Sequence, residues 1–247
     1  MSRIGSDLEL ACKLADIAGG ILLDLQKSGL FEAKALGKAG DRTANAFLME
    51  ALAAQRPEDA VLSEEEKDND KRLSASRVWI VDPLDGTREY GEARSDWAVH
   101  VALAIDGVPV IGAVALPGLG LTLNSGPGII VPPPHGRLRM LVSRTRPAAE
   151  AVAVAKLLDA ALVPMGSAGA KAMAVVRGEA DIYLHTGGQY EWDNCAPAAV
   201  AIAAGLHVSR IDGTPLLYNN TDTYLPDLLI CRKDAAAEIL AMVKQAA

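Results

Sequence analysis

Apolar residues recur at helical spacing near the start of the chain. They are Leu8, Cys12, Ala15, Leu22 and Leu25. This spacing places them on one helix face, so a helix is predicted from Ser6 to about Gln26. Ser6 followed by Glu9 three residues later is typical of a capping box at its start. Further helices are predicted at 43–55, 147–158, 167–177 and 194–204, and Asp234 is predicted to cap a last one.

Short aliphatic runs between these segments predict strands. They fall at 61–62, 78–81, 97–105, 108–116, 139–143, 182–185, 206–209 and 228–231. Asp106-Gly107 lies between the two longest runs and is a hairpin turn signal. The polar stretch 67–77 and the Gly- and Pro-rich stretch 118–136 are predicted to be loops, the second also a boundary between two lobes. Alternating helices and strands favour an α/β layer architecture.

Composition narrows the classes of function. The chain has 247 residues, half of them hydrophobic, and a formal net charge of −7. The absence of a basic stripe argues against nucleic acid as a partner, and the acidic balance argues against docking on anionic lipid. It leaves room for a phosphorylated small molecule, because a bound metal can reverse the local sign of charge.

Location is predicted from what the sequence lacks. No run approaches the ~20 apolar residues of a membrane-spanning helix, and the first residues contain no apolar signal core. Cys12, Cys195 and Cys231 are odd in number and lack zinc-ligand spacing. We therefore expect reduced thiols in a cytoplasmic protein.

The stretch VWIVDPLDGTREY, residues 78–90, joins a buried strand to a cluster of polar groups. Pro83 bends the chain, so Asp82 and Asp85 can converge. Gly86 lets the backbone approach a ligand, and Thr87 adds a hydroxyl. Paired carboxylates with an amide and a hydroxyl suit Mg²⁺ holding a phosphate. An Asp-capped turn is the structural alternative, which the position directly after an apolar strand makes less favourable.

Two more carboxylates occupy similar positions. Glu64 follows the short strand at 61–62, and Asp193 stands beside Trp192 just before a predicted helix. A solvated acidic loop would explain Glu64, and a helix N-cap would explain Asp193. An N-cap and a site residue are compatible roles, because helix N-termini attract anions.

These stretches resemble a known family. WIVDPLDGT and WDNCAPAAVAIAAG are similar to the two signatures of the inositol monophosphatase-like, lithium-sensitive magnesium phosphatases, and LSEE resembles a third element in the same order. The likeness runs from about Leu8 to Cys231. It implies an α/β (α+β) fold, a layered αβαβα sandwich, and a homodimer. It also implies an N-terminal α+β lobe at 1–135 carrying most metal ligands and a C-terminal α/β lobe at 136–247 completing the substrate site.

The resemblance also assigns roles to residues. The implied ligands of two or three Mg²⁺ ions are Glu64, Asp82, the carbonyl of Leu84, Asp85 and Asp193. Gly86 and Thr87 would give amides to the phosphate, beside Asp85 and Asp193, and Thr87 would orient the attacking water. Glu64 and Asp85 are included among the catalytic residues. Glu65 would hold a water of the metal's coordination sphere.

One position departs from the family pattern. Members often carry an aspartate in the second helix that partners the threonine, and the matching position in GDRTANAFL is taken to be Asn45. An amide orients a hydroxyl but cannot accept its proton. Either Asp41 substitutes for it or the water needs no such base.

Three stretches indicate the substrate. DGTREY, GSAGAKAM at 166–173 and DGTPLLYN at 212–219 resemble the CysQ-type branch. That branch implies Mg²⁺-dependent release of the 3'-phosphate of 3'-phosphoadenosine 5'-phosphate, which yields AMP and removes a by-product of sulfate assimilation. Ser167 and Lys171 are the predicted substrate contacts, with Arg144 added as a further cation. Tyr190 or Tyr218 could offer a flat surface for the base.

Other functions stay open at this point. The same fold could hydrolyse inositol 1-phosphate or fructose 1,6-bisphosphate. A metal- or phosphate-binding regulatory protein without catalysis is a second alternative, disfavoured because all four carboxylates and Thr87 are present. The four histidines form no ligand cluster, and His100, on a strand face with small alanines, is interpreted as a core residue.

Overall fold

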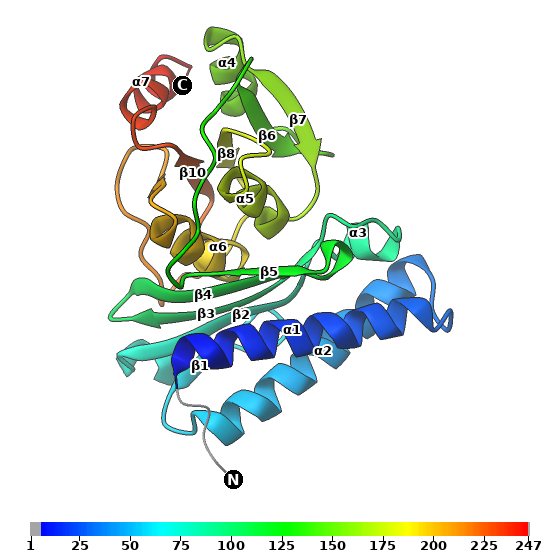
Figure 1. The fold of residues 1–247 in the computed structure, drawn as a ribbon. Coiled ribbons are helices and arrows are strands. Elements are labelled where there is room, and N and C mark those ends of the chain that lie inside the picture. Colours follow the sequence, from blue (N-terminus) through cyan, green and yellow to red (C-terminus); the bar gives the residue numbers. More distant parts are fainter. Residues whose placement is uncertain (1–5, 247) are drawn as a thin grey trace.

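In the computed structural model, which describes residues 6–246, helices and sheets alternate in layers (Figure 1). The first half contains α1 (Asp7–Lys27), α2 (Ala33–Gln55), β1 (Ala60–Ser63), β2 (Arg77–Asp85), α3 (Thr87–Gly91), β3 (Ala98–Ile105), β4 (Val108–Leu116) and β5 (Leu121–Asn124). The second half contains β6 (Arg139–Ser143), α4 (Ala149–Leu157), β7 (Ala161–Met165), α5 (Ala168–Val176), β8 (Ile182–Thr186), α6 (Glu191–Ala203), β9 (His207–Ser209), β10 (Asp227–Cys231) and α7 (Ala236–Ala246).

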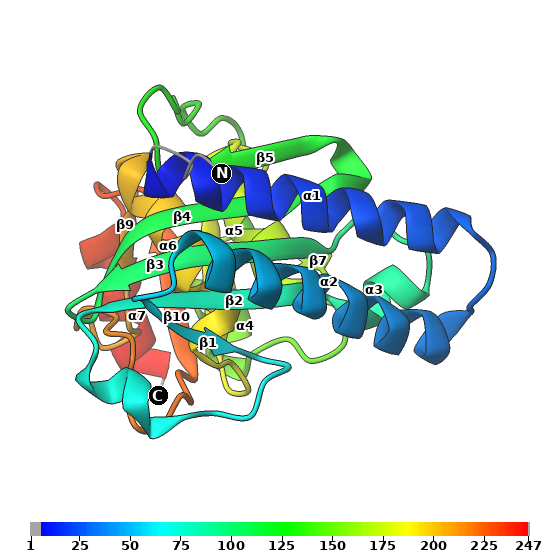
Figure 2. The same ribbon diagram turned by 90° about the horizontal axis from the view of Figure 1, so that it is seen from below.

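Each half builds one five-stranded sheet. The first has the order β1-β2-β3-β4-β5, with β1 and β2 parallel and the other neighbours antiparallel. The second has the order β7-β6-β8-β10-β9, in which β6 runs parallel to β7 and β8. Helices α1 and α2 lie across the outer face of the first sheet (Figure 2). The predicted αβαβα sandwich is therefore confirmed.

Three apolar clusters hold the layers together, and β2 shows how the sequence builds two of them. Val78 and Ile80 face the central cluster that contains α5 and α6, whereas Trp79 and Val81 face α1 and α2. This is the period-two alternation of a strand buried on both faces. A third cluster joins the second sheet to α4 and α7.

The central cluster contains residues of both sheets, so the two halves share a core. The first sheet ends at Asn124 and the second begins at Arg139. The boundary predicted between 135 and 136 falls in the connecting segment, and the division into two lobes stays a prediction. Within residues 6–246, no helix combines the length and apolar character needed to cross a bilayer.

Several predicted elements match the structure closely. Ser6 accepts a hydrogen bond from the amide of Glu9 at 3.0 Å and caps α1. The predicted hairpin is present, with φ of 49° at Asp106 and 79° at Gly107. Such positive values are what this turn dipeptide favours.

Other elements were predicted with the wrong limits. Helix α2 begins at Ala33, ten residues before the predicted start at Thr43. Its first half carries Gly37 and Gly40, which have low helix propensity but pack against α3 and β2. The predicted loop 118–136 contains β5, and β7 was not predicted. Both strands are short, with four and five residues, and β7 contains Pro164.

Candidate metal and phosphate site

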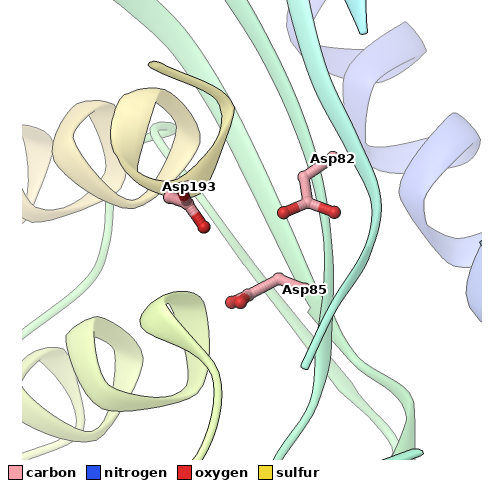
Figure 3. A group of neighbouring side chains, drawn as sticks. All are labelled: Asp82, Asp85 and Asp193. Atoms are coloured by element: carbon pink, nitrogen blue, oxygen red, sulfur yellow. The ribbon is translucent and has the colours of Figure 1, made fainter. Parts of the chain in front are cut away.

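Three carboxylates from two layers meet in the interior. Asp82 and Asp85 come from the end of β2 and Asp193 from the first turn of α6, and one oxygen of each lies within 4.8 Å of the others (Figure 3). Asp82 and Asp85 are 1% and 6% exposed. A set of oxygen donors at this spacing could hold a metal ion, and hard oxygen ligands are those that Mg²⁺ prefers.

A local irregularity of β2 brings its two carboxylates to the same side. Residues three apart in a regular strand point to opposite faces. The pairing of β2 with β3 shifts register between Asp82 and Asp85, around Pro83, which has no amide hydrogen. Asp82 Oδ1 also accepts the amide of Leu84 at 3.0 Å, which stabilises the bend. The strand was predicted to end at Val81, but it continues through this bulge to Asp85.

Asp85 also anchors α5. Its carboxylate accepts hydrogen bonds from the Ser167 hydroxyl and from the amides of Ala168 (3.1 Å) and Gly169 (2.6 Å). Burial raises the pKa of Asp85, but the interactions with His100 and Ser167 outweigh it and lower the pKa to about 2. Asp85 is therefore ionised and joins the bulge of β2 to the C-terminal half.

The other carboxylates repel one another. Burial and the neighbouring Glu64 raise the pKa of Asp82 well above its usual range, and burial and Asp85 raise that of Asp193 to about 7. Burial and the charge of Asp41 raise the pKa of Glu64 to about 7, although its side chain stays accessible to solvent. Crowded acids with raised pKa values are a physical signature of a site that a cation would stabilise.

Gly86 and Thr87 form the turn from β2 into α3. Gly86 has φ of 91°, and a Cβ there would lie 3.2 Å from both Ser167 Cβ and Trp97 Cβ. Thr87 Oγ1 lies 3.2 Å from the carbonyl of Leu84 and 3.5 Å from Asp41 Oδ1. Thus the Leu84 carbonyl, an implied metal ligand, accepts the Thr87 hydroxyl in this structure.

Asp41, and not Asn45, reaches Thr87. Asn45 lies one helical turn further along α2, where it donates to Glu66 at 2.7 Å and accepts the Ser63 hydroxyl at 2.8 Å. The expectation that Asn45 partners the threonine is corrected, and the alternative with Asp41 agrees with the geometry. Burial and the charge of Glu65 raise the pKa of Asp41 to about 7, against the lowering effect of Thr87.

The predicted substrate contacts line a cavity of about 330 Å³ that touches Gly86 and Thr87. Lys171 is buried there, and its ammonium donates to the carbonyl oxygens of Gly166 (3.2 Å) and Ser167. The Arg144 guanidinium donates to Glu89 and Glu92, each at 2.8 Å. Both cations lie at the cavity wall, and both already have protein acceptors.

The two tyrosines considered for base stacking differ in exposure. Tyr218 is buried, and its hydroxyl donates to Asn194 at 2.9 Å, so it belongs to the core. Tyr190 is 41% exposed and stacks on Trp192 with centroids 5.0 Å apart. Its amide donates to Asp193 at 2.7 Å, so its backbone adjoins the carboxylate group.

Sequence reasoning missed the position of His100. It is fully buried, with Nε2 3.2 Å from Asp85 Oδ2, a contact that lacks the alignment of a good hydrogen bond. Its Nδ1 lies 3.0 Å from the carbonyl of Trp192. His100 also pairs with Asp82 across β2 and β3. The sequence did contain a signal for this position, because His100 is a polar residue in an otherwise apolar strand.

Fold and site together define a family of phosphatases. The chain matches the inositol monophosphatase family over residues 7–131 and 135–246, so the protein belongs to that family. A 3'-phosphoadenosine 5'-phosphate phosphatase of Mycobacterium leprae (strain TN) is 48% identical over 97% of this chain and 94% of its own length. The 3'(2'),5'-bisphosphate nucleotidase CysQ of Escherichia coli (strain K12) is 28% identical over 88% and 96% of the two chains.

Solved structures agree. CysQ from Bacteroides thetaiotaomicron, a bacterial member of the inositol monophosphatase family, aligns with a TM-score of 0.77 at 25% identity, covering 92% of this chain and 97% of that one. The resemblance read from the DPLDGT and WDNCAP stretches is thereby confirmed.

Proposed function

We propose that the protein is a Mg²⁺-dependent phosphatase that removes the 3'-phosphate of 3'-phosphoadenosine 5'-phosphate, yielding AMP and inorganic phosphate. The observation that carries this proposal is the meeting of Asp82, Asp85 and Asp193 beside the Gly86-Thr87 turn. Identity of 48% to a relative named for this activity supports the choice of substrate. Removal of a by-product of sulfate assimilation would be its role.

The donor set fits magnesium. Asp82, Asp85 and Asp193 would hold the ions, with Glu64 at the solvent side and Glu65 next to it. Bound Mg²⁺ would neutralise charge on the phosphoryl oxygens and lower the pKa of a water molecule. Two or three ions would balance much of the repulsion that raises these pKa values.

The chain's own residues position the reactants. The amides of Gly86 and Thr87 bind the phosphate, because the left-handed Gly86 turns the backbone toward the site. Thr87 orients the attacking water and relays its proton to the carboxylate of Asp41, which accepts it. Ser167, Lys171 and Arg144 line the cavity that takes the rest of the nucleotide.

Side-by-side turnover tests this proposal. Phosphate release would be measured with Mg²⁺ on 3'-phosphoadenosine 5'-phosphate, inositol 1-phosphate and fructose 1,6-bisphosphate. We expect kcat/KM to favour the nucleotide by about a hundredfold. A preference for either sugar phosphate would keep the metal chemistry and reject the substrate. No turnover of any of the three, with Mg²⁺ bound, would favour the regulatory alternative.

A homodimer in the cytoplasm belongs to the same proposal. It rests on the family resemblance alone, and sedimentation at micromolar concentration would measure the subunit number.

A further inference from the structure

A second cavity is also lined by Thr87. It has a volume of about 490 Å³ and lies between α2 and α3, which pack against each other (Figure 2). Lys34 and Lys38 of α2 and Arg88 of α3 line it, together with Thr87 and Glu92. Thr87 and Arg88 also line the 330 Å³ cavity described above, so the two spaces adjoin at these residues.

The three cations of this second cavity are exposed and have no partner in the described part of the chain. Within residues 6–246, the side chains of Lys34, Lys38 and Arg88 form no hydrogen bond or ion pair, while the single carboxylate, Glu92, is held by Arg144. The chain as a whole carries a net charge of −7. The lining of this cavity is therefore positively charged, unlike the chain as a whole. Such a cavity suits an anionic ligand.

The geometry of the proposed reaction indicates which anion this cavity would bind. Phosphoryl transfer proceeds in line, with the nucleophile and the leaving group on opposite sides of phosphorus. Asp41 and Thr87, the pair that orients the water, belong to the α2 side. The leaving AMP then lies on the opposite side, in the cavity lined by Ser167 and Lys171. Because Thr87 lines both cavities, a phosphate held at this residue adjoins the second cavity, called here the α2-side cavity, while the leaving AMP occupies the other one.

We propose that the cavity lined by Lys34, Lys38 and Arg88 binds inorganic phosphate as it leaves the metal centre. The inference rests on the proposed function for the direction of attack. The AMP product blocks the other side, so the new phosphate, which has taken its fourth oxygen from the water, departs toward α2. Lysine and arginine bind such a dianion through charge-assisted hydrogen bonds.

Calorimetric titration of the Mg²⁺-loaded protein with orthophosphate tests the site. We expect two classes of binding in the wild type, one at the metal centre and one at the α2-side cavity. The double variant Lys34→Gln/Lys38→Gln is expected to lose the second class, with affinity reduced at least about fivefold. Asp82→Asn, which weakens the metal centre, is expected to lose the first class and keep the second.

A matched control distinguishes binding at this cavity from a general effect of removing two positive charges. Lys156→Gln/Lys244→Gln removes the same charge from exposed positions on α4 and α7, and it is expected to retain both classes. A single class in the wild type, or two unchanged classes in the Lys34/Lys38 variant, would overturn the proposal. So would equal weakening in both double variants.

The outcome stays separable from the proposed function. If the nucleotide is not hydrolysed but Lys34 and Lys38 still control a second class of phosphate binding, the anion site stands and the substrate assignment fails. If the nucleotide is hydrolysed and phosphate inhibition is purely competitive in every variant, the substrate assignment stands and the anion site fails.

Discussion

Asp41 and Thr87 carry the proposed proton transfer. They come from α2 and from the turn after β2, 46 residues apart along the chain, and their oxygen atoms lie 3.5 Å apart. The raised pKa of Asp41, about 7, suits a group that exchanges a proton near neutral pH. Asn45, one turn away, holds the loop after β1 through Ser63 and Glu66. Two residues one turn apart on α2 therefore have different roles: Asp41 contacts Thr87, and Asn45 holds the loop after β1.

Asp41→Asn is expected to lower kcat by about a hundredfold while leaving KM nearly unchanged, because the amide keeps the shape but cannot take a proton. Steady-state kinetics with the nucleotide would measure this. Asn45→Ala serves as the comparison and is expected to keep kcat within about threefold, with a loss of stability of about 1 kcal/mol from the broken hydrogen bonds. The reverse ranking of the two variants would reject Asp41 as the base.

Helix α2 must approach α3 closely for this pair to form. A Cβ at Gly37 would lie 2.6 Å from Thr87 Cγ2, and one at Gly40 would lie 2.9 Å from the Tyr90 ring. The same helix supplies Asp41 and Asn45 to the interior and Lys34 and Lys38 to the α2-side cavity. Its two glycines, Gly37 and Gly40, weaken the helix but let it lie close to the Gly86-Thr87 turn and to α3.

Gly37→Ala is expected to lower kcat at least about tenfold, since the added methyl group pushes α2 away from Thr87 and separates Asp41 from it. Gly20→Ala is the matched control: Gly20 lies inside α1 with nothing within 4 Å of an added Cβ. It is expected to raise the free energy of unfolding by about 0.5–1 kcal/mol without changing kcat. Equal activity in both variants would contradict the positioning role of Gly37.

The whole molecule assembles its site from several layers. Asp82 and Asp85 belong to the first sheet, Asp193 to the helical layer between the sheets, and Asp41 to the outer helices. Packing these layers gathers carboxylates that repel one another, and the cost appears as raised pKa values. When no cation is bound, the repulsion between these carboxylates therefore destabilises the folded state.

This repulsion predicts how stability depends on pH after removal of divalent ions. Asp41, Glu64 and Asp193 have pKa values of about 7 in the folded protein, against about 4 when unfolded. Between these values the folded state holds more protons, so stability falls as pH rises. The melting temperature with a chelator is expected to be lower at about pH 8 than at about pH 5.5.

Mg²⁺ is expected to remove most of this difference, because a bound cation stabilises the ionised carboxylates. Asp82→Asn provides the control: with one acid fewer, its chelated form is expected to melt at a higher temperature than the wild type at about pH 8. Melting temperatures that rise with pH in the chelated wild type would contradict the proposed crowding of charges.

The sequence alone predicted much of the fold and part of the site. Local patterns predicted most helices and strands, because helix caps, hairpin turns and alternation depend on neighbouring residues: Ser6 and Glu9 are one instance, Asp106 and Gly107 another. The stretch around Asp82 and Asp85 indicated metal chemistry for a similar reason, since a strand followed by carboxylates, proline and glycine is informative by itself. Asp193 required the family resemblance to join them.

Contacts between distant segments explain what local patterns could not supply. The register shift that turns Asp82 and Asp85 to one side depends on pairing with β3. The choice of Asp41 over Asn45 depends on where α2 touches Thr87, and the proximity of His100 to Asp85 depends on the neighbouring strand. Such contacts arise from the packing of layers, whose free energy is spread over the three cores rather than concentrated in neighbouring residues.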